Sequence, residues 1–130
     1  PLALSRAFAA QGQLTSGHII NMLDSRVQDY YKLHVPYHLS KRSLLALTRM
    51  LAIELAPGVA VNAVAPGLIL APEGKGDEYL QALAHTNPLN RSGGPQDICE
   101  AVLFLLRSEF ITGQIIYVDG GRHMKGHMYG

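Results

Sequence analysis

The chain has very little cysteine and no tryptophan. Cys99 is the single cysteine among 130 residues. One cysteine excludes an internal disulfide and agrees with a reducing compartment, so we expect a cytoplasmic protein. Cys99 has no metal-ligating companion at useful spacing, and we expect it to be a small, buried apolar residue.

An excess of one charge and a long apolar run are also missing. The chain has 11 basic and 10 acidic residues, for a formal net charge of +1, and its lysines and arginines are scattered. The basic block that a nucleic-acid backbone needs is therefore absent. The most apolar stretch, residues 59–70, is interrupted by Asn62, Pro66 and Gly67 and is too short to cross a bilayer. We expect neither a nucleic-acid partner nor a membrane partner.

What the chain does have is a core-forming composition and an alternation of two apolar patterns. Hydrophobic residues make up 48% of it, enough to bury a core. Apolar runs predict strands, and apolar positions at helical spacing predict helices. We expect strands over residues 18–23, 59–64 and 115–118, and helices over residues 2–11, 37–55, 78–85 and from 94–95 to 106. Residues 122–130 form a polar tail for which no element is predicted.

This order predicts an α/β fold with a parallel sheet, because strands that alternate with helices are joined by right-handed crossovers. Three parallel strands with an open edge make a poor free-standing sheet. We therefore expect further strands beside residues 18–23. The long connection over residues 68–90 is typical of a functional lid. Its polar residues either contact a substrate or are solvated loop charges: Glu73, Asp77, Glu78 and His85.

Tyr37 and Lys41 lie one helical turn apart, so their side chains share a face. A nearby ammonium lowers the pKa of a phenol, which makes such a pair a candidate general acid. The alternative is a half-buried tyrosine beside a solvated lysine. Asp24 follows the first predicted strand, and Pro66–Gly67 follows the second. Ligands bind at the carboxyl ends of parallel strands, which favours the general acid.

Five segments carry a resemblance to a known family: residues 37–41 (YHLSK), 61–67 (VNAVAPG), 88–91 (PLNR), 111–114 (ITGQ) and 118–121 (VDGG). In this order and spacing they resemble the short-chain dehydrogenase/reductases. The resemblance implies that residues 1–130 are the C-terminal catalytic half of a doubly wound parallel-sheet Rossmann fold. The glycine-rich phosphate-binding half is absent from this sequence, so we expect the chain alone to be inactive.

The residue thirteen positions before Tyr37 separates subgroups of that family. Most members have serine there, whereas this chain has Asp24, which resembles the pteridine reductases. The resemblance implies an NADPH-dependent reductase that transfers a hydride to a C=N bond of a pterin or dihydrofolate. It implies a proton relay by Asp24, Tyr37 and Lys41, in which Lys41 lowers the Tyr37 pKa, and a homotetramer. The cofactor would be bound by Met22, Tyr37, Lys41, Pro66, Gly67 and Leu68.

Two alternatives stay open at this point. A register shift by one residue would place Ser25 in the usual serine position, and the protein would be a carbonyl reductase of the 3-oxoacyl-carrier-protein type. The chain could also be a non-catalytic remnant that only associates with partners. A metal site is not expected, since His123 and His127 lack a third ligand.

Overall fold

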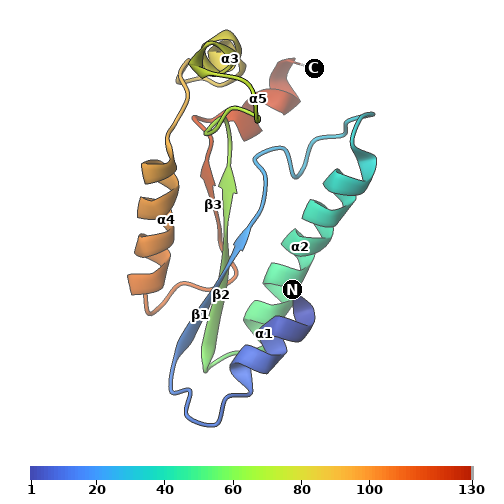
Figure 1. The fold of residues 1–130 in the computed structure, drawn as a ribbon. Helices are drawn as coiled ribbons and strands as arrows, with labels where there is room; N and C mark the ends of the chain where they lie inside the picture. The colour runs from blue at the N-terminus through green and yellow to red at the C-terminus, as the bar shows by residue number, and fades with distance from the viewer. Residues whose placement is uncertain (130) are drawn as a thin grey trace.

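The fold is a three-stranded parallel sheet covered by helices on both faces (Figure 1). The computed structural model describes the backbone of residues 1–129 and the side chains of residues 1–125. The elements in chain order are α1 (Leu2–Ala9), β1 (Gly17–Met22), α2 (Val35–Glu54), β2 (Val59–Pro66), α3 (Asp77–Leu83), the 3-10 helix η1 (Ala84–Thr86), α4 (Pro95–Arg107), β3 (Ile115–Val118) and α5 (Arg122–Tyr129). The predicted α/β class with a parallel sheet is confirmed.

Strand β2 is central, with β1 on one side and β3 on the other. Its residues from Val61 to Ala65 are almost completely buried. A strand covered on both faces is apolar along most of its length, which explains the apolar run, and the polar Asn62 within it is hydrogen-bonded. β2 continues to Pro66, two residues beyond the predicted end, and Pro66 pairs with Val118 of β3.

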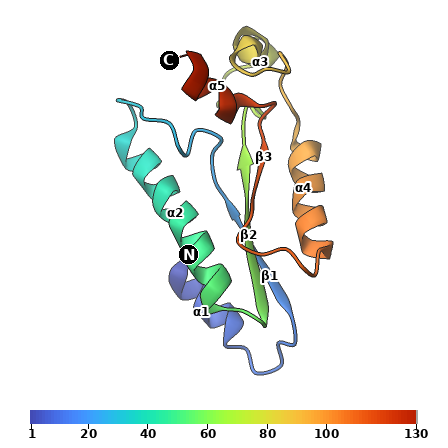
Figure 2. The ribbon, with the colours of Figure 1, turned by 180° about the vertical axis from the view of Figure 1, so that it is seen from behind.

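Helix α2 packs on one face of the sheet together with α1, and α4 covers the other face (Figures 1 and 2). The core between α2 and the sheet is centred on Leu51, Ala52, Val59 and Val61. Pro36 lies in the first turn of α2, where a missing backbone N–H costs nothing. Pro95 has the same place in α4, after Gly94.

Two side chains tie the loop before β3 to the central strand. The buried Asn62 donates from Nδ2 to the Ile111 carbonyl oxygen at 2.9 Å, and its Oδ1 accepts from the Gln114 N–H at 2.9 Å. The Val61 N–H donates to Thr112 Oγ1 at 3.0 Å. These bonds satisfy backbone groups that the short β3 leaves without a strand partner.

Two expectations about the second half of the chain were wrong. The polar tail forms helix α5, because the Asp119 carboxylate accepts the N–H groups of Gly121 at 3.0 Å and His123 at 2.6 Å and so caps its first turn. Cys99 is exposed, since it follows Ile98 and lies off the apolar stripe of α4. No helix among the described residues is long and apolar enough to cross a bilayer.

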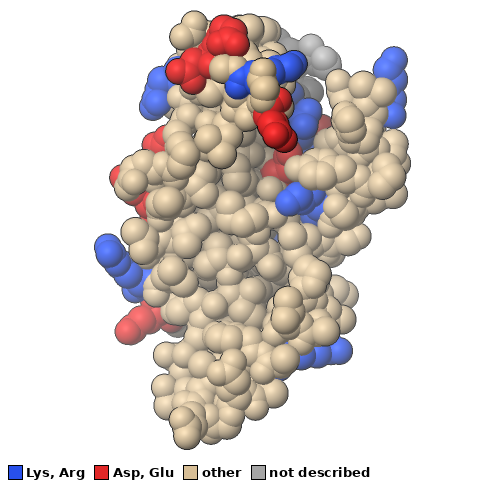
Figure 3. Space-filling view, viewed as in Figure 1, with Lys and Arg blue, Asp and Glu red and all other residues tan. Residues whose placement is uncertain are grey.

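The carboxyl ends of the strands meet at one end of the molecule, where α3 and α5 also lie (Figure 1). The loop between β1 and α2 reaches the same end. On the face shown in Figure 3, charged side chains gather over this end, and the middle of the face carries few. The fold therefore brings the polar residues after β1, β2 and β3 together.

Candidate functional site

The Asp24 side chain is held between its own loop and helix α2. Asp24 Oδ1 accepts the backbone N–H of Arg26 at 2.7 Å, which is the geometry of an Asx turn. Oδ2 accepts the Tyr37 hydroxyl at 2.8 Å. The two oxygens thus have separate tasks, one fixing the loop and the other holding the phenol. The structure brings together the Asp24 and Tyr37 that the sequence analysis paired.

The Tyr37 hydroxyl is a phenol that keeps its proton. Burial, the hydrogen bond to Asp24 and the Asp24 charge raise the pKa of Tyr37 to about 12, and the Arg26 charge opposes them. The expectation that Lys41 lowers this pKa was wrong for the described chain. The Lys41 ammonium lies 5.7 Å from the Tyr37 ring centroid, whereas the Asp24 carboxylate touches the hydroxyl.

The Lys41 side chain turns instead toward the end of β1. Its ammonium donates to the Met22 carbonyl oxygen at 2.8 Å. An ammonium has three donors, so this bond leaves others for hydroxyl groups of a ligand. Lys41 thus lies beside Tyr37 and Met22, and their joint binding of a cofactor stays a prediction.

Pro66 and Gly67 lie at the end of β2, against the turn that follows β3. The Gly67 N–H donates to the Val118 carbonyl oxygen at 3.0 Å. A Cβ atom at Gly67 would lie 2.6 Å from Cα and Cβ of Asp119, closer than such atoms approach in folded proteins. Glycine is therefore needed at position 67 because the turn that follows β3 leaves no room for a side chain. Leu68 follows and is half-buried.

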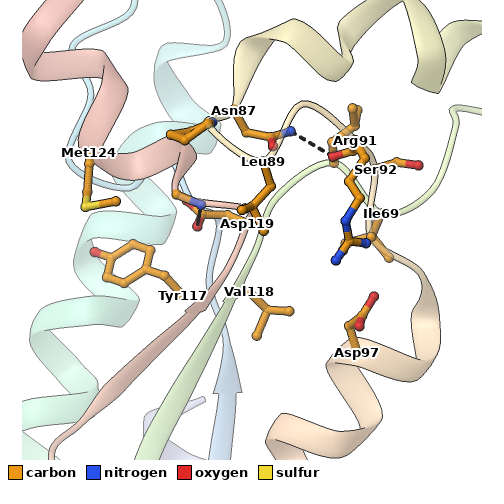
Figure 4. A pocket seen from close by; sticks show the side chains of 15 residues that line it. Ile69, Asn87, Leu89, Arg91, Ser92, Asp97, Tyr117, Val118, Asp119 and Met124 are labelled. Carbon is orange, nitrogen blue, oxygen red and sulfur yellow. Dashed lines mark hydrogen bonds between the residues drawn. The ribbon is translucent and has the colours of Figure 1, made fainter.

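A cavity of about 230 Å³ lies beside Asp24 and the end of β2, whereas Met22, Tyr37 and Lys41 do not line it. It is lined by Asp24, Ser25, Arg26, Pro66, Gly67, Leu68, Tyr79, Leu83, Thr86, Asn87, Asp119 and Arg122. A second cavity of about 430 Å³ lies at the free edge of β3, between α4 and α5 (Figure 4). Leu68, Asn87 and Asp119 line both cavities. We assign the site to the smaller cavity because it alone contains Asp24, the partner of the Tyr37 hydroxyl.

Several lining residues were not predicted from the sequence. Tyr79 and Leu83 come from α3, and Arg122 from α5. The signal for the first two was the position of α3 inside the predicted lid. The lid charges named above do not line this cavity: Glu78 Oε1 accepts the Gly76 N–H at 3.0 Å, and His85 Nδ1 bonds to the Ala82 carbonyl oxygen at 2.9 Å.

Metal ligation finds no support in the described side chains. Among them, no group of three or more histidine, cysteine, aspartate or glutamate residues is placed to hold an ion. His123 Nδ1 lies 3.0 Å from Asp119 Oδ2, and its ring stacks on Tyr117 with a centroid distance of 3.9 Å. The His127 side chain lies outside the described residues.

Comparisons with known proteins identify the family of the chain. A sequence model of the enoyl-(acyl carrier protein) reductase family matches residues 2–123. The chain belongs to the short-chain dehydrogenase/reductase family. Within that family it is similar to pteridine reductase-like members. It is 37% identical over 123 residues to dihydromonapterin reductase of Citrobacter koseri, covering 95% of this chain and 51% of that protein.

Two further relatives bear on the reaction class. A ketoacyl reductase of the granaticin polyketide synthase of Streptomyces violaceoruber is 45% identical over 94 residues, covering 69% of this chain and 38% of that protein. The crystal structure of FolM alternative dihydrofolate reductase 1 from Brucella canis, complexed with NADP, superposes with a TM-score of 0.87 at 34% identity, covering 95% of this chain and 50% of that one. The Rossmann-like fold is thereby confirmed. The chain spans about half the length of these curated relatives or less.

Proposed function

We propose that the protein is an NADPH-dependent reductase that transfers a hydride to a C=N bond of a pterin or dihydrofolate, with Asp24, Tyr37 and Lys41 in its site. The observation that carries the proposal is the hydrogen bond from the Tyr37 hydroxyl to Asp24 Oδ2, 2.8 Å long, at the wall of the cavity. The similarity to a dihydromonapterin reductase and to a dihydrofolate reductase bound to NADP supports the substrate class and the cofactor.

In this proposal the carboxyl of Asp24 is the group that delivers a proton to the substrate nitrogen. Reduction of C=N places a hydride on carbon and a proton on nitrogen, so the site needs an acid close to that nitrogen. Tyr37 keeps its proton near neutral pH because its pKa is raised to about 12. The proton that Asp24 passes to the substrate nitrogen is then replaced from water, while Tyr37 stays protonated and holds Asp24 Oδ2 through its hydroxyl.

The residues around Lys41 fit a nicotinamide cofactor. NADPH would supply the hydride. Lys41, held on the Met22 carbonyl, has donors left for ribose hydroxyls. Pro66 ends β2, and Gly67 and Leu68 follow it at a strand end, where backbone groups can bind the carboxamide. Met22 is 41% exposed at the end of β1, available to the same ligand.

A carbonyl reductase is the second candidate, favoured by the similarity to a ketoacyl reductase. Ser25 would then take the role of Asp24. Ser25 lies in the cavity wall but is 5% exposed, and the Tyr37 hydroxyl donates to Asp24. These contacts support the pterin reaction over the carbonyl reaction.

We also propose that the complete protein is a cytoplasmic homotetramer. Helix α2 buries Leu51 against the sheet, yet it leaves Met50 66% exposed and Ile53 82% exposed on its outer side. A helix pair across a two-fold axis would bury both residues. Sedimentation of the full-length protein tests this, and a monomer at micromolar concentration would contradict it.

The function is tested by assaying the full-length protein with NADPH and three substrates: a dihydropterin, dihydrofolate and a ketoacyl thioester. We expect turnover of a pterin or folate, a loss of at least about a hundredfold in kcat for Tyr37→Phe, and little change for Tyr30→Phe, whose ring is 91% exposed. Turnover of the thioester alone would favour the carbonyl reductase. Absence of turnover with all three would favour the remnant.

A further inference from the structure

Arg26 contacts the Asp24 carboxylate at the oxygen that Tyr37 does not contact. Its Nε lies 3.6 Å from Asp24 Oδ1, which is an ion-pair distance and too long for a well-formed hydrogen bond. Its backbone N–H donates to the same oxygen at 2.7 Å. Asp24 Oδ1 is therefore contacted by both the backbone N–H and the guanidinium of Arg26, and Oδ2 accepts the hydrogen bond from Tyr37.

The guanidinium is itself held in place. It lies 5.9 Å from the centroid of the Tyr31 ring, within the range of a cation–π contact. Arg26 also lines the proposed substrate cavity, and its side chain is 38% exposed. An arginine that touches a functional carboxylate, an aromatic ring and the cavity is well placed to affect the reaction without taking part in proton transfer.

A second arginine holds the same loop and serves as a comparison. Arg42 donates from Nη2 to the Asp29 carbonyl oxygen at 2.7 Å and lies 4.3 Å from the centroid of the Tyr30 ring. Both arginines thus clamp the loop between β1 and α2 through an aromatic ring. Of the two, only Arg26 forms an ion pair with Asp24.

We propose that Arg26 is a positioning residue: its guanidinium fixes the Asp24 carboxylate in the orientation that presents Oδ2 to Tyr37 and to the substrate. The proposal rests on the proposed function for its kinetic consequence, but its geometric part concerns Asp24 and Tyr37 alone. The Arg26 charge itself lowers the pKa of Tyr37, whereas the Asp24 contact raises it, so the loss of the charge and the loss of the contact shift this pKa in opposite directions.

The kinetic test compares Arg26→Met with Arg26→Lys in the full-length protein. Because the backbone bond at 2.7 Å survives any side-chain change, we expect a moderate loss for Arg26→Met. The expected fall in kcat is about fivefold, equivalent to about 1 kcal/mol, with the KM for the pterin changed less than about twofold. Arg26→Lys returns the cation and should recover most of the loss. Arg42→Met is the matched control for loosening of the loop.

A measurement without turnover separates this proposal from the proposed function. Tyrosine fluorinated on its ring, incorporated at position 37, gives a fluorine NMR signal and brings the phenol's ionisation into an accessible pH range. We expect Arg26→Met to lower the ionisation midpoint, because the released Asp24 carboxylate no longer holds the phenol, and Arg42→Met to leave it in place. A raised or unmoved midpoint in Arg26→Met, or equal shifts in both variants, would overturn the positioning role of Arg26 even if the enzyme reduces pterins. A fall confined to Arg26→Met would support it even if the substrate is a ketone.

Discussion

The Asn62 side chain braces the loop before β3 through two hydrogen bonds, and its removal is a direct test of what stabilises the fold. Asn62→Leu keeps the size of the side chain and removes both of its hydrogen bonds, which join Nδ2 to the Ile111 carbonyl oxygen and Oδ1 to the Gln114 N–H. The backbone groups of the loop before β3 then lose their partners. The expected result is a less stable protein in which β3 loosens before the rest of the sheet.

The magnitude follows from the exposure of the two orphaned groups. A buried polar group without a partner costs about 1–3 kcal/mol, so two cost about 2–6 kcal/mol. Ile111 is half-buried and Gln114 is exposed, so water can reach part of the loop. We therefore expect the lower part of the range, a loss of about 2–3 kcal/mol in the free energy of unfolding, which is a large share of the 5–15 kcal/mol typical of a domain.

The assay is denaturant unfolding of the full-length protein, with hydrogen exchange at the Gln114 amide as a local readout. Gln114→Ala is the control, because its side chain makes only an exposed bond to the Thr112 carbonyl oxygen at 3.3 Å. If Asn62→Leu fails to fold, Thr112→Val removes the acceptor of the buried Val61 N–H, and Thr112→Ser keeps it. Unfolding free energies within about 0.5 kcal/mol of wild type for both Asn62→Leu and Thr112→Val would refute the brace.

Two further predictions concern the site. Gly67→Ala should lower the free energy of unfolding by about 1–3 kcal/mol and weaken NADPH binding, because the added Cβ would lie 2.6 Å from Asp119. Gly12→Ala is the control, since a Cβ there would have no atom within 4 Å. Equal melting temperatures of the two variants would contradict the reasoning. Asp24→Asn should lower the Tyr37 pKa from about 12 toward the ordinary value of 10, by removing the charge that favours the protonated phenol. A raised pKa contributes stability that is complete below about pH 10 and is lost as the pH rises toward about 12, so the variant should lose less stability over that interval. Tyrosinate absorbance relative to Tyr37→Phe measures the Tyr37 pKa, and alkaline unfolding measures the stability. An unchanged midpoint of Tyr37 ionisation would count against the Asp24 contact.

The strands were predictable because each is a short run of mostly apolar residues. β3 matches its predicted bounds, and β2 begins at its predicted residue and runs two residues beyond its predicted end. Helix α4 was predicted from an apolar stripe at helical spacing, and its buried member Leu105 agrees; the stripe consists of Ile98, Ala101, Val102, Leu105 and Leu106. Leu106, another stripe position, is 43% exposed, because periodicity defines a helix face without saying how far the neighbouring elements cover it.

Contacts between elements are what the sequence could not supply. Helix α5 depends on the Asp119 carboxylate, which caps its first turn. The sequence of the helix shows no apolar periodicity from which it could be predicted. The direction of the Tyr37 pKa shift likewise depends on a contact between two elements. A spacing of four residues brings Lys41 to the same helix face, but the charge that touches the hydroxyl belongs to a loop after a different strand. The direction of a pKa shift depends on the nearest charge, and only the fold decides which charge that is.

The choice between a carboxylate and a hydroxyl at this site is at bottom a question of strand register. The ladder between β1 and β2 continues past Met22: the Leu23 N–H donates to the Val64 carbonyl oxygen at 2.8 Å, and the Ser25 N–H donates to that of Pro66 at 2.9 Å. Asp24 lies between these two bonds. Successive side chains of an extended chain point to opposite faces, so the burial of Leu23 and Ser25 turns Asp24 the other way.

A slip of one residue would therefore exchange Asp24 for Ser25 beside Tyr37. Two features oppose such a slip. Leu23 packs in the core with Ala63 and Ala65, and a slip would remove it from that contact. Asn21, on the same strand, donates from Nδ2 to Thr48 Oγ1 of α2 at 3.0 Å, which ties β1 to the helix that carries Tyr37. The packing of β1 thus determines which functional group meets the phenol, and with it the chemistry open to the site.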